Sequence, residues 1–252
     1  MIDIEIIPRI KDFEILLDTY KPVKANKFLP EWYKKQKYIT MQSAWSDADD
    51  IDNIPKTIKN CPAVREYITD GIVIPSWTDI IINKKDEKYS WNITVQNSYS
   101  LKHNTLLTMD KHIIEQTKPL ELNNIKNFGT LKLTCPYWFR TPKGYGLQFL
   151  DPFYNHRNNI RLLPGKVETD IWHEVNLPFE FNEDLSEIKN KKLLLKAGDP
   201  LLLVTPYKIK EKFNLKICEF SSEFNELQNK NNIINNSVSN NWNSYQSIKN
   251  EK

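Results

Sequence analysis

The stretch IKNFGTLKLTCPYWFRTPKGYGLQFLDPF, residues 125–153, decides the fold class of this chain. Apolar and aromatic residues are punctuated there by Pro and Gly, a pattern that favours two or three strands. Gly144 and Gly146 flank Tyr145, and glycine lets a backbone turn tightly without a Cβ clash. A chain with only six glycines places two of them in this one turn.

Further strand patterns lie on both sides of this stretch. Residues 71–97 are rich in Val, Ile, Thr and Trp and predict two strands around a polar turn at 83–88. Residues 162–182 predict one or two strands, and 193–209 predict two strands around a Gly-Asp turn. FNLKICEFS, residues 213–221, predicts a last strand. The fold class is therefore mainly β, a sandwich or a similarly folded sheet, because no βαβ alternation is seen.

Helices are predicted near both ends. Ile2, Ile4 and Ile6 alternate as in a strand, and short helices are expected within 28–37 and 56–70, each with a Pro near its start. We expect one β-rich domain over 1–222, with a helical and strand part at 1–70 and a β core at 71–222. The Asn-rich residues 223–252 predict a C-terminal helix or a mobile tail.

Composition narrows the class of protein. The 252 residues carry a net charge of only +3, which argues against nucleic acid as a partner, since phosphate binding needs a concentrated basic face. Cys61, Cys135 and Cys218 are far apart, so we expect three free thiols in a reducing compartment. The sequence has no run of about eighteen apolar residues, so we expect no membrane span. The first residues include acidic ones, whereas a signal peptide would begin with basic residues.

Three motifs in 140–207 resemble the β-clip core of dUTPases and dCTP deaminases. In that family the first is a P-x-G-[YT]-x-G turn, the second a hairpin of the form G-x-x-[DE]-x-D, and the third a K-x-G-D-x-I strand. Their order matches that family, as does the separation of about twenty residues between the first two. The matching residues are Pro142, Gly144, Tyr145 and Gly146; Gly165, Glu168 and Asp170; and Lys196, Gly198 and Asp199.

This resemblance implies a nucleotide site. Glu168 would activate a water, with Mg²⁺ as the cofactor, and the subunits would form a trimer with sites between them. Separately from the resemblance, the many aromatic residues of the β region indicate packing in the core and sheets. The alternatives are a protein interface and a stacking pocket for a base or sugar, lined by Tyr145 and Trp172 with Glu168 and Asp170 as polar partners. The ligand-binding candidates are Tyr145, Arg157, Glu168, Asp170, Trp172 and His173.

The sequence also departs from the β-clip enzymes. FLDPFYNHRNN stands where the nucleotide-hydrolysing members have a phosphate-binding Pro-Arg-Ser segment, and Arg157 is displaced from that place. The Gly-rich C-terminal arm is missing, and IWHE replaces the glycine after the hairpin acid. These departures argue against nucleotide hydrolysis, although the fold itself is compatible with them.

A second resemblance covers more of the chain. LPEWYKK, KTIKNCPAVREYITDGIVIPSWTDI and the three motifs together resemble an uncharacterised protein family of tailed phages, especially marine ones. This implies a viral protein in the host cytoplasm or, alternatively, in the virion. The leading prediction is a non-enzymatic binding protein without cofactor, whose partner is a protein or a small molecule. The alternatives are a dUTPase-like enzyme and an inhibitor of a host protein.

Other catalytic patterns are incomplete. The four histidines form no metal-binding motif, so a metal site would need distant residues such as Asp170, His173 and His156. Cys61 precedes Pro62 near a helix start, where a thiol pKa can fall, but a structural cysteine is the simpler interpretation. Walker A, GxGxxG and GxSxG motifs are all missing.

Overall fold

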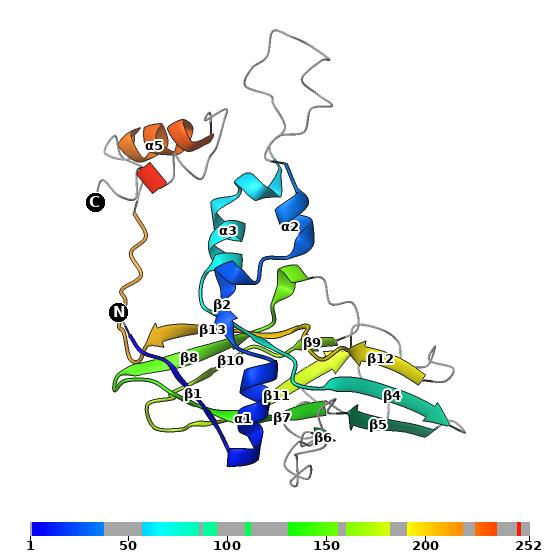
Figure 1. Cartoon of the computed structure of the whole chain (residues 1–252). Helices are drawn as coiled ribbons and strands as arrows, with labels where there is room; N and C mark the ends of the chain where they lie inside the picture. Colours follow the sequence, from blue (N-terminus) through cyan, green and yellow to red (C-terminus); the bar gives the residue numbers. More distant parts are fainter. Residues whose placement is uncertain are drawn as a thin grey trace, which may run out of the picture. The chain divides into compact units, whose positions relative to one another are not determined.

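A computed structural model describes residues 2–37, 57–85, 88–94, 109–111, 131–155, 160–181, 191–218, 225–235 and 246–247. By their contacts the residues fall into two units, one of 1–28 with 71–211 and one of 29–70 with 212–252. The single β-rich domain over 1–222 expected from composition stays a prediction. The described strands belong to the first unit and most of the described α-helices to the second (Figure 1).

The first sheet of the β-rich unit is built around its longest strand, β7 (Leu131–Arg140). All of its pairings are antiparallel, and β7 contacts three other strands. The strand order is β1-β7-β11-β9, and β6 also pairs with β7. The partner strands are β1 (Glu5–Pro8), β6 (Met109–Lys111), β9 (Ile160–Leu162) and β11 (Glu174–Phe181).

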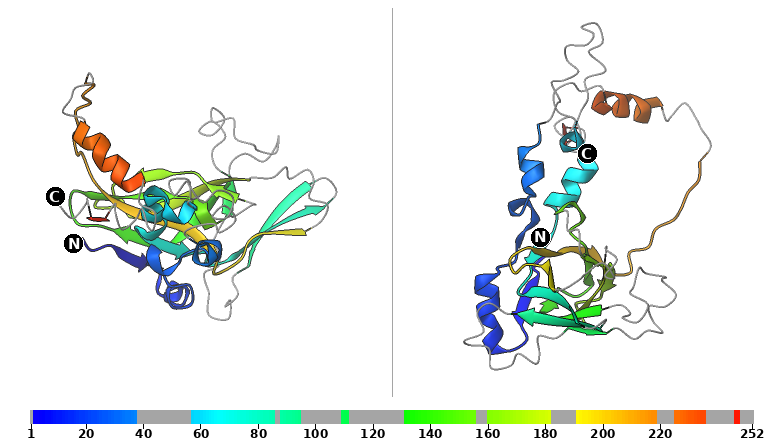
Figure 2. Two further views of the ribbon diagram at one scale, coloured as in Figure 1. Left: turned by 90° about the horizontal axis from the view of Figure 1, so that it is seen from above. Right: turned by 90° about the vertical axis from the view of Figure 1, so that its right-hand side faces the viewer.

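A second antiparallel sheet carries the glycine-bearing turn, and a third extends to one side of it (Figure 2). The second has the order β10-β8-β13-β3-β2 and the third the order β12-β4-β5. The second sheet comprises β2 (Val23–Lys24), β3 (Ile72–Pro75), β8 (Tyr145–Leu150), β10 (Gly165–Val167) and β13 (Pro200–Lys208). The third comprises β4 (Asp79–Lys85), β5 (Lys88–Thr94) and β12 (Lys191–Leu195).

One hydrophobic core joins the three sheets. On β7 every second residue is buried, and these side chains are Leu131, Leu133, Cys135, Tyr137 and Phe139. The ring of Phe139 meets that of Phe149 on β8 edge to face, with centroids 5.2 Å apart, and so connects the first two sheets. Side chains of β4 and β12 belong to the same core cluster. The mainly β, sandwich-like fold class predicted from the sequence is therefore confirmed.

Helices cover little of the β-rich unit. A 3-10 turn, η1 (Lys11–Phe13), leads into α1 (Glu14–Thr19), which buries Phe13 and Leu16. The strand pattern at the start of the chain did not indicate this helix. The other short helical elements in the described part of this unit are the 3-10 turns η2 (Ala25–Lys27) and η9 (Phe153–Asn155).

The second unit contains both predicted N-terminal helices. They are α2 (Glu31–Lys35) and α3 (Pro62–Thr69), and η5 (Ile58–Asn60) precedes α3. Lys59 connects these segments because its ammonium donates to the Gln36 carbonyl at 3.1 Å and lies 5.5 Å from the centre of the Tyr33 ring. The helix α5 (Asn225–Asn235) lies in the C-terminal segment where a helix was expected.

The predicted strand at 213–221 is wrong over the part that the structure describes. Residues 211–218 have no strand structure there. Phe213, Leu215 and Ile217 are 89%, 83% and 90% exposed. An alternating sequence becomes a strand only when another strand offers hydrogen bonds, and no described strand does so here. Residues 219–221 lie outside the described residues.

Candidate functional site: two paired turns

The first turn connects β7 to β8. The amide of Tyr145 donates to the carbonyl of Pro142 at 3.1 Å, which closes the turn. Gly144 has a φ of +84°, a conformation that costs an L-residue with a Cβ about 1 kcal/mol or more. A proline two residues before a left-handed glycine therefore explains why this sequence turns here.

The second turn follows β10. The amides of Ile171 and Trp172 both donate to the carbonyl of Glu168, at 3.0 Å and 2.9 Å. β10 pairs with β8, with Val167 opposite Leu147, so both turns extend from one strand pair. The structure thus brings together two segments that are separated by about twenty residues in the sequence.

Side chains brace the two turns against each other. The Gly144 amide donates to Oδ2 of Asp170 at 2.8 Å. The Thr141 hydroxyl donates to the Tyr145 carbonyl at 2.6 Å and lies 2.8 Å from the Thr169 hydroxyl. A hydroxyl has one proton, so Thr169 is the donor in the second contact. Both threonines are buried, and this network fixes the separation of the turns.

His173 fastens the second turn to β7. Its Nδ1 lies 3.1 Å from the Phe139 carbonyl and 3.0 Å from the Thr169 carbonyl. Both partners are acceptors, so Nδ1 carries the proton and donates. The Phe139 amide donates to the carbonyl of His173 at 3.0 Å, which completes the attachment. In this arrangement His173 positions the turn.

Tyr207 of β13 lies beside the paired turns, next to Gly146 and Lys166, although the sequence did not identify it as a site residue. The Lys166 ammonium lies 4.9 Å from the centre of its ring. Burial raises the pKa of the Tyr207 hydroxyl, and the charges of Glu168 and Asp170 raise it further. A tyrosine directly after Pro206 in an apolar strand offers no sequence signal for this role, because the pairing of β13 with β8 brings it there.

The candidate site residues do not share one environment. Glu168 is exposed, and Tyr145, Asp170 and His173 are half-buried. Ile171 and Trp172 form an apolar tip, with exposed fractions of 75% and 64%. Arg157 lies outside the described residues. So does His156, which was a possible metal ligand together with Asp170 and His173.

The chemistry available to the paired turns follows from these positions. Oδ2 of Asp170 accepts a hydrogen bond from a backbone amide, while its Oδ1 is buried and has no hydrogen-bond partner among the described residues. Within the described ranges no three His, Cys, Asp or Glu side chains are grouped so that they could hold a metal ion. The described residues thus do not form a three-ligand site for the Mg²⁺ that the β-clip resemblance implies, and we derive no step through it. The paired turns present one exposed carboxylate and an exposed apolar tip on a braced backbone.

The three cysteines lie in different surroundings. Cys61, Cys135 and Cys218 are all unpaired. Cys135 belongs to the core, and burial raises the pKa of its thiol to about 12, which makes it a poor nucleophile. None of the helices in the described segments is long and apolar enough to cross a membrane.

Comparison with known proteins gives only structural matches. No family model matches the chain, and no curated protein does. The dUTPase of Staphylococcus bacteriophage 80alpha with dUPNHPP is 10% identical, with a TM-score of 0.26, over 46% of this chain and 90% of the dUTPase. The dUTPase from phage phi11 of S. aureus is 12% identical, with a TM-score of 0.25, over 46% of this chain and 99% of that one.

These TM-scores are low, so the match is a local likeness and says nothing about activity. The similarity to an uncharacterised phage family stays a prediction.

Proposed function

We propose that this protein is a non-catalytic, phage-encoded binding protein that recognises a protein partner through the tip of its second turn. The observation that supports this is the exposure of Ile171 and Trp172 on a turn whose backbone is held by Asp170, Thr169 and His173. The partner is a protein of the infected host cell or, alternatively, of the virus particle.

An exposed tryptophan next to an exposed isoleucine is a feature of recognition surfaces. Aromatic side chains dominate the binding energy of many interfaces because they bury a large area at small conformational cost. Fixing the turn before binding reduces the entropy lost when the complex forms. The hydrogen bonds between the two turns would therefore strengthen binding without contacting the partner.

The test compares two exposed tryptophans in the full chain. Trp172→Ala removes the tip, and Trp138→Ala removes another side chain that is 41% exposed, on β7. Each protein is immobilised, exposed to lysate of infected host cells, and its captured proteins are quantified by mass spectrometry. We expect one partner to be retained by wild type and Trp138→Ala, and to bind Trp172→Ala about thirtyfold more weakly. The proposal is wrong if no captured protein depends on Trp172.

The β-clip enzyme is the second candidate, and one observation favours it. The two motifs that resemble that family meet in space, joined by the hydrogen bond between Gly144 and Asp170. In such an enzyme Glu168, which is exposed, would accept a proton from the attacking water. Tyr145 and Trp172 would contact the base or sugar, and Arg157 a phosphate.

Nucleotide binding separates the two candidates. The unfolding temperature is measured with dUTP, dCTP and other nucleotides in the presence of magnesium chloride, and hydrolysis is followed for wild type and Glu168→Gln. A nucleotide at about a hundred times its dissociation constant adds roughly 2.7 kcal/mol of stability. Stabilisation together with hydrolysis that Glu168→Gln abolishes would replace the binding proposal by the enzyme, and light scattering would then test for a trimer.

A further inference from the structure

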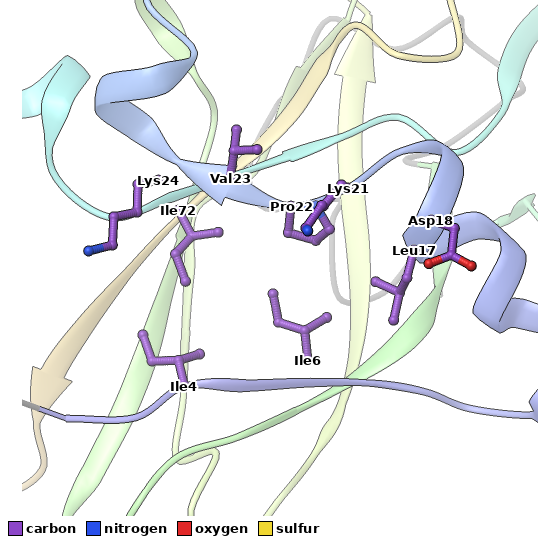
Figure 3. Close-up of a pocket in the computed structure, with 9 residues that line it drawn as sticks. All are labelled: Ile4, Ile6, Leu17, Asp18, Lys21, Pro22, Val23, Lys24 and Ile72. Carbon is purple, nitrogen blue, oxygen red and sulfur yellow. The ribbon is translucent and has the colours of Figure 1, made fainter.

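A separate cavity lies on the β-rich unit, lined by different residues from the paired turns. It measures about 400 Å³ and is lined by β1, α1, β2 and β3 together with the residues beside them (Figure 3). β1 and β2 are the end strands of the first and second sheets. The cavity therefore lies where the two-sheet core reaches the surface, and Ile4, Ile6, Leu17 and Ile72 in its wall also pack against that core.

The wall of this cavity is mainly apolar, and its positively charged side chains outnumber its negatively charged ones. Six lining side chains are purely apolar, and all six are partly exposed. They are Ile4, Ile6, Leu17, Pro22, Val23 and Ile72. The charged lining residues are Lys21, Lys24 and Asp18, all exposed, which leaves a net charge of +1.

The two lysines are available to a ligand. In the part of the chain that the structure describes, neither ammonium has a hydrogen-bond or ion-pair partner. Lys21 lies in the segment after α1 and Lys24 at the end of β2, so both belong to one wall of the cavity. In Figure 3 Lys24 lies at the left and Asp18 at the right beside Leu17, with Lys21 between them. An anionic group between Lys21 and Lys24 would be attracted by both ammonium groups and would lie on the side of Lys21 away from Asp18.

We propose that this cavity binds a small amphipathic anion, with an alkyl or aryl body against the isoleucines and an acidic head group at Lys21 and Lys24. A volume of about 400 Å³ falls in the usual range for small-molecule sites. The described residues that line the cavity include no aromatic ring and no uncharged polar side chain. A nucleobase would find neither a stacking surface nor a hydrogen-bond partner among these side chains, which favours a lipid-like carboxylate over a nucleotide.

The first experiment uses two fluorescent probes that differ in charge. 8-Anilinonaphthalene-1-sulfonate carries an anionic head, and N-phenyl-1-naphthylamine has the same ring system without it. Both are titrated into the full chain. We expect saturable binding of the anionic probe at one molecule per chain, and weaker binding of the neutral probe.

Charge variants then locate the site. Lys21→Gln with Lys24→Gln should weaken the anionic probe about tenfold and leave the neutral probe unchanged, because only the head-group contacts are lost. The matched control is Lys11→Gln with Lys196→Gln, two exposed lysines outside the cavity, which should change neither probe. All four positions are at the surface, so these variants keep the fold.

A wall variant and a competitor complete the test. Ile4→Asp places a carboxylate in the cavity and should weaken both probes, and dodecanoate should displace the anionic probe at lower concentration than dodecanol does. Equal affinity of the anionic probe for the cavity variant and the control variant overturns the proposal, as does binding that never saturates. None of these residues belongs to the paired turns, so the outcome is independent of the partner tested through Trp172.

Discussion

Gly146 offers the sharpest test of how the paired turns are packed. It lies on β8 between β10 and β13, where a Cβ would be 2.6 Å from the carbonyl oxygen of Val167. The same Cβ would be 2.7 Å from two carbons of the Tyr207 ring. Both distances are far below van der Waals contact, so even one methyl group requires the neighbours to move.

We expect Gly146→Ala to lower the free energy of unfolding by about 2–3 kcal/mol, the upper part of the range for overpacking. The ring of Tyr207 can rotate away, but the Val167 oxygen belongs to the paired backbone of β10 and cannot move without disturbing the sheet. Adding Tyr207→Ala should therefore relieve only part of the loss caused by the methyl group.

Two other glycines serve as controls. Gly165 has nothing within 4 Å of a Cβ and is not among the glycines with positive φ, so Gly165→Ala should change stability by less than about 1 kcal/mol. Gly144 is equally open but has a φ of +84°, and Gly144→Ala should cost about 1 kcal/mol through backbone strain alone. The three costs therefore follow the order Gly146, Gly144, Gly165.

The assay is equilibrium unfolding in urea, followed by tryptophan fluorescence, because Trp77 is fully buried in this unit. The midpoint should fall in the stated order while the slope stays constant. A Gly146→Ala protein as stable as Gly165→Ala would refute the packing of β8 against β10 and Tyr207, as would full recovery of stability in the double variant.

Two further predictions concern the cysteines. Burial raises the pKa of the Cys135 thiol to about 12, so the unfolded chain loses this proton at lower pH than the folded chain. The free energy of unfolding should therefore decrease by on the order of a few kcal/mol as the pH rises from about 9 to 12. Urea unfolding at several pH values measures this decrease, which should be smaller in Cys135→Ala than in wild type. The second prediction concerns thiol labelling with a chromogenic disulfide reagent. The exposed Cys218 should react at once, the half-buried Cys61 more slowly, and the buried Cys135 only after unfolding. Rapid labelling of Cys135 in the folded chain would contradict its burial.

The sequence predicts local structure well where a single residue type imposes the geometry. Gly144 indicated a tight turn, because few other residues adopt a positive φ at low cost, and the turn lies there. Pro62 indicated the start of a helix, and α3 begins at that residue. Within 71–97 two strands were expected, whereas the described residues hold three, β3, β4 and β5, because β3 pairs in a different sheet from the other two. β4 and β5 extend to Lys85 and Lys88, inside the polar turn expected at 83–88.

Sheet partners are set by contacts that the local pattern does not contain. β1 pairs with β7, and Glu5 and Arg140 of that pair form an ion pair across 135 positions in the sequence. Phe213, Leu215 and Ile217 alternate as well as the residues of β7 do, but no described strand pairs with them. Alternation therefore predicts that a segment is able to form a strand, whereas the rest of the sheet determines whether it does.

The same distinction applies to the function of single residues, and Asp170 illustrates it. Its place in the hairpin motif suggested a polar contact with a ligand, while the structure uses its Oδ2 to hold the Gly144 amide. Its Oδ1 is buried and has no hydrogen-bond partner among the described residues. Asp170 therefore acts on the turn itself, which serves either candidate function equally. For this reason the exposed side chains around it, Trp172 and Glu168, and not Asp170 itself, distinguish a partner-binding turn from a catalytic one.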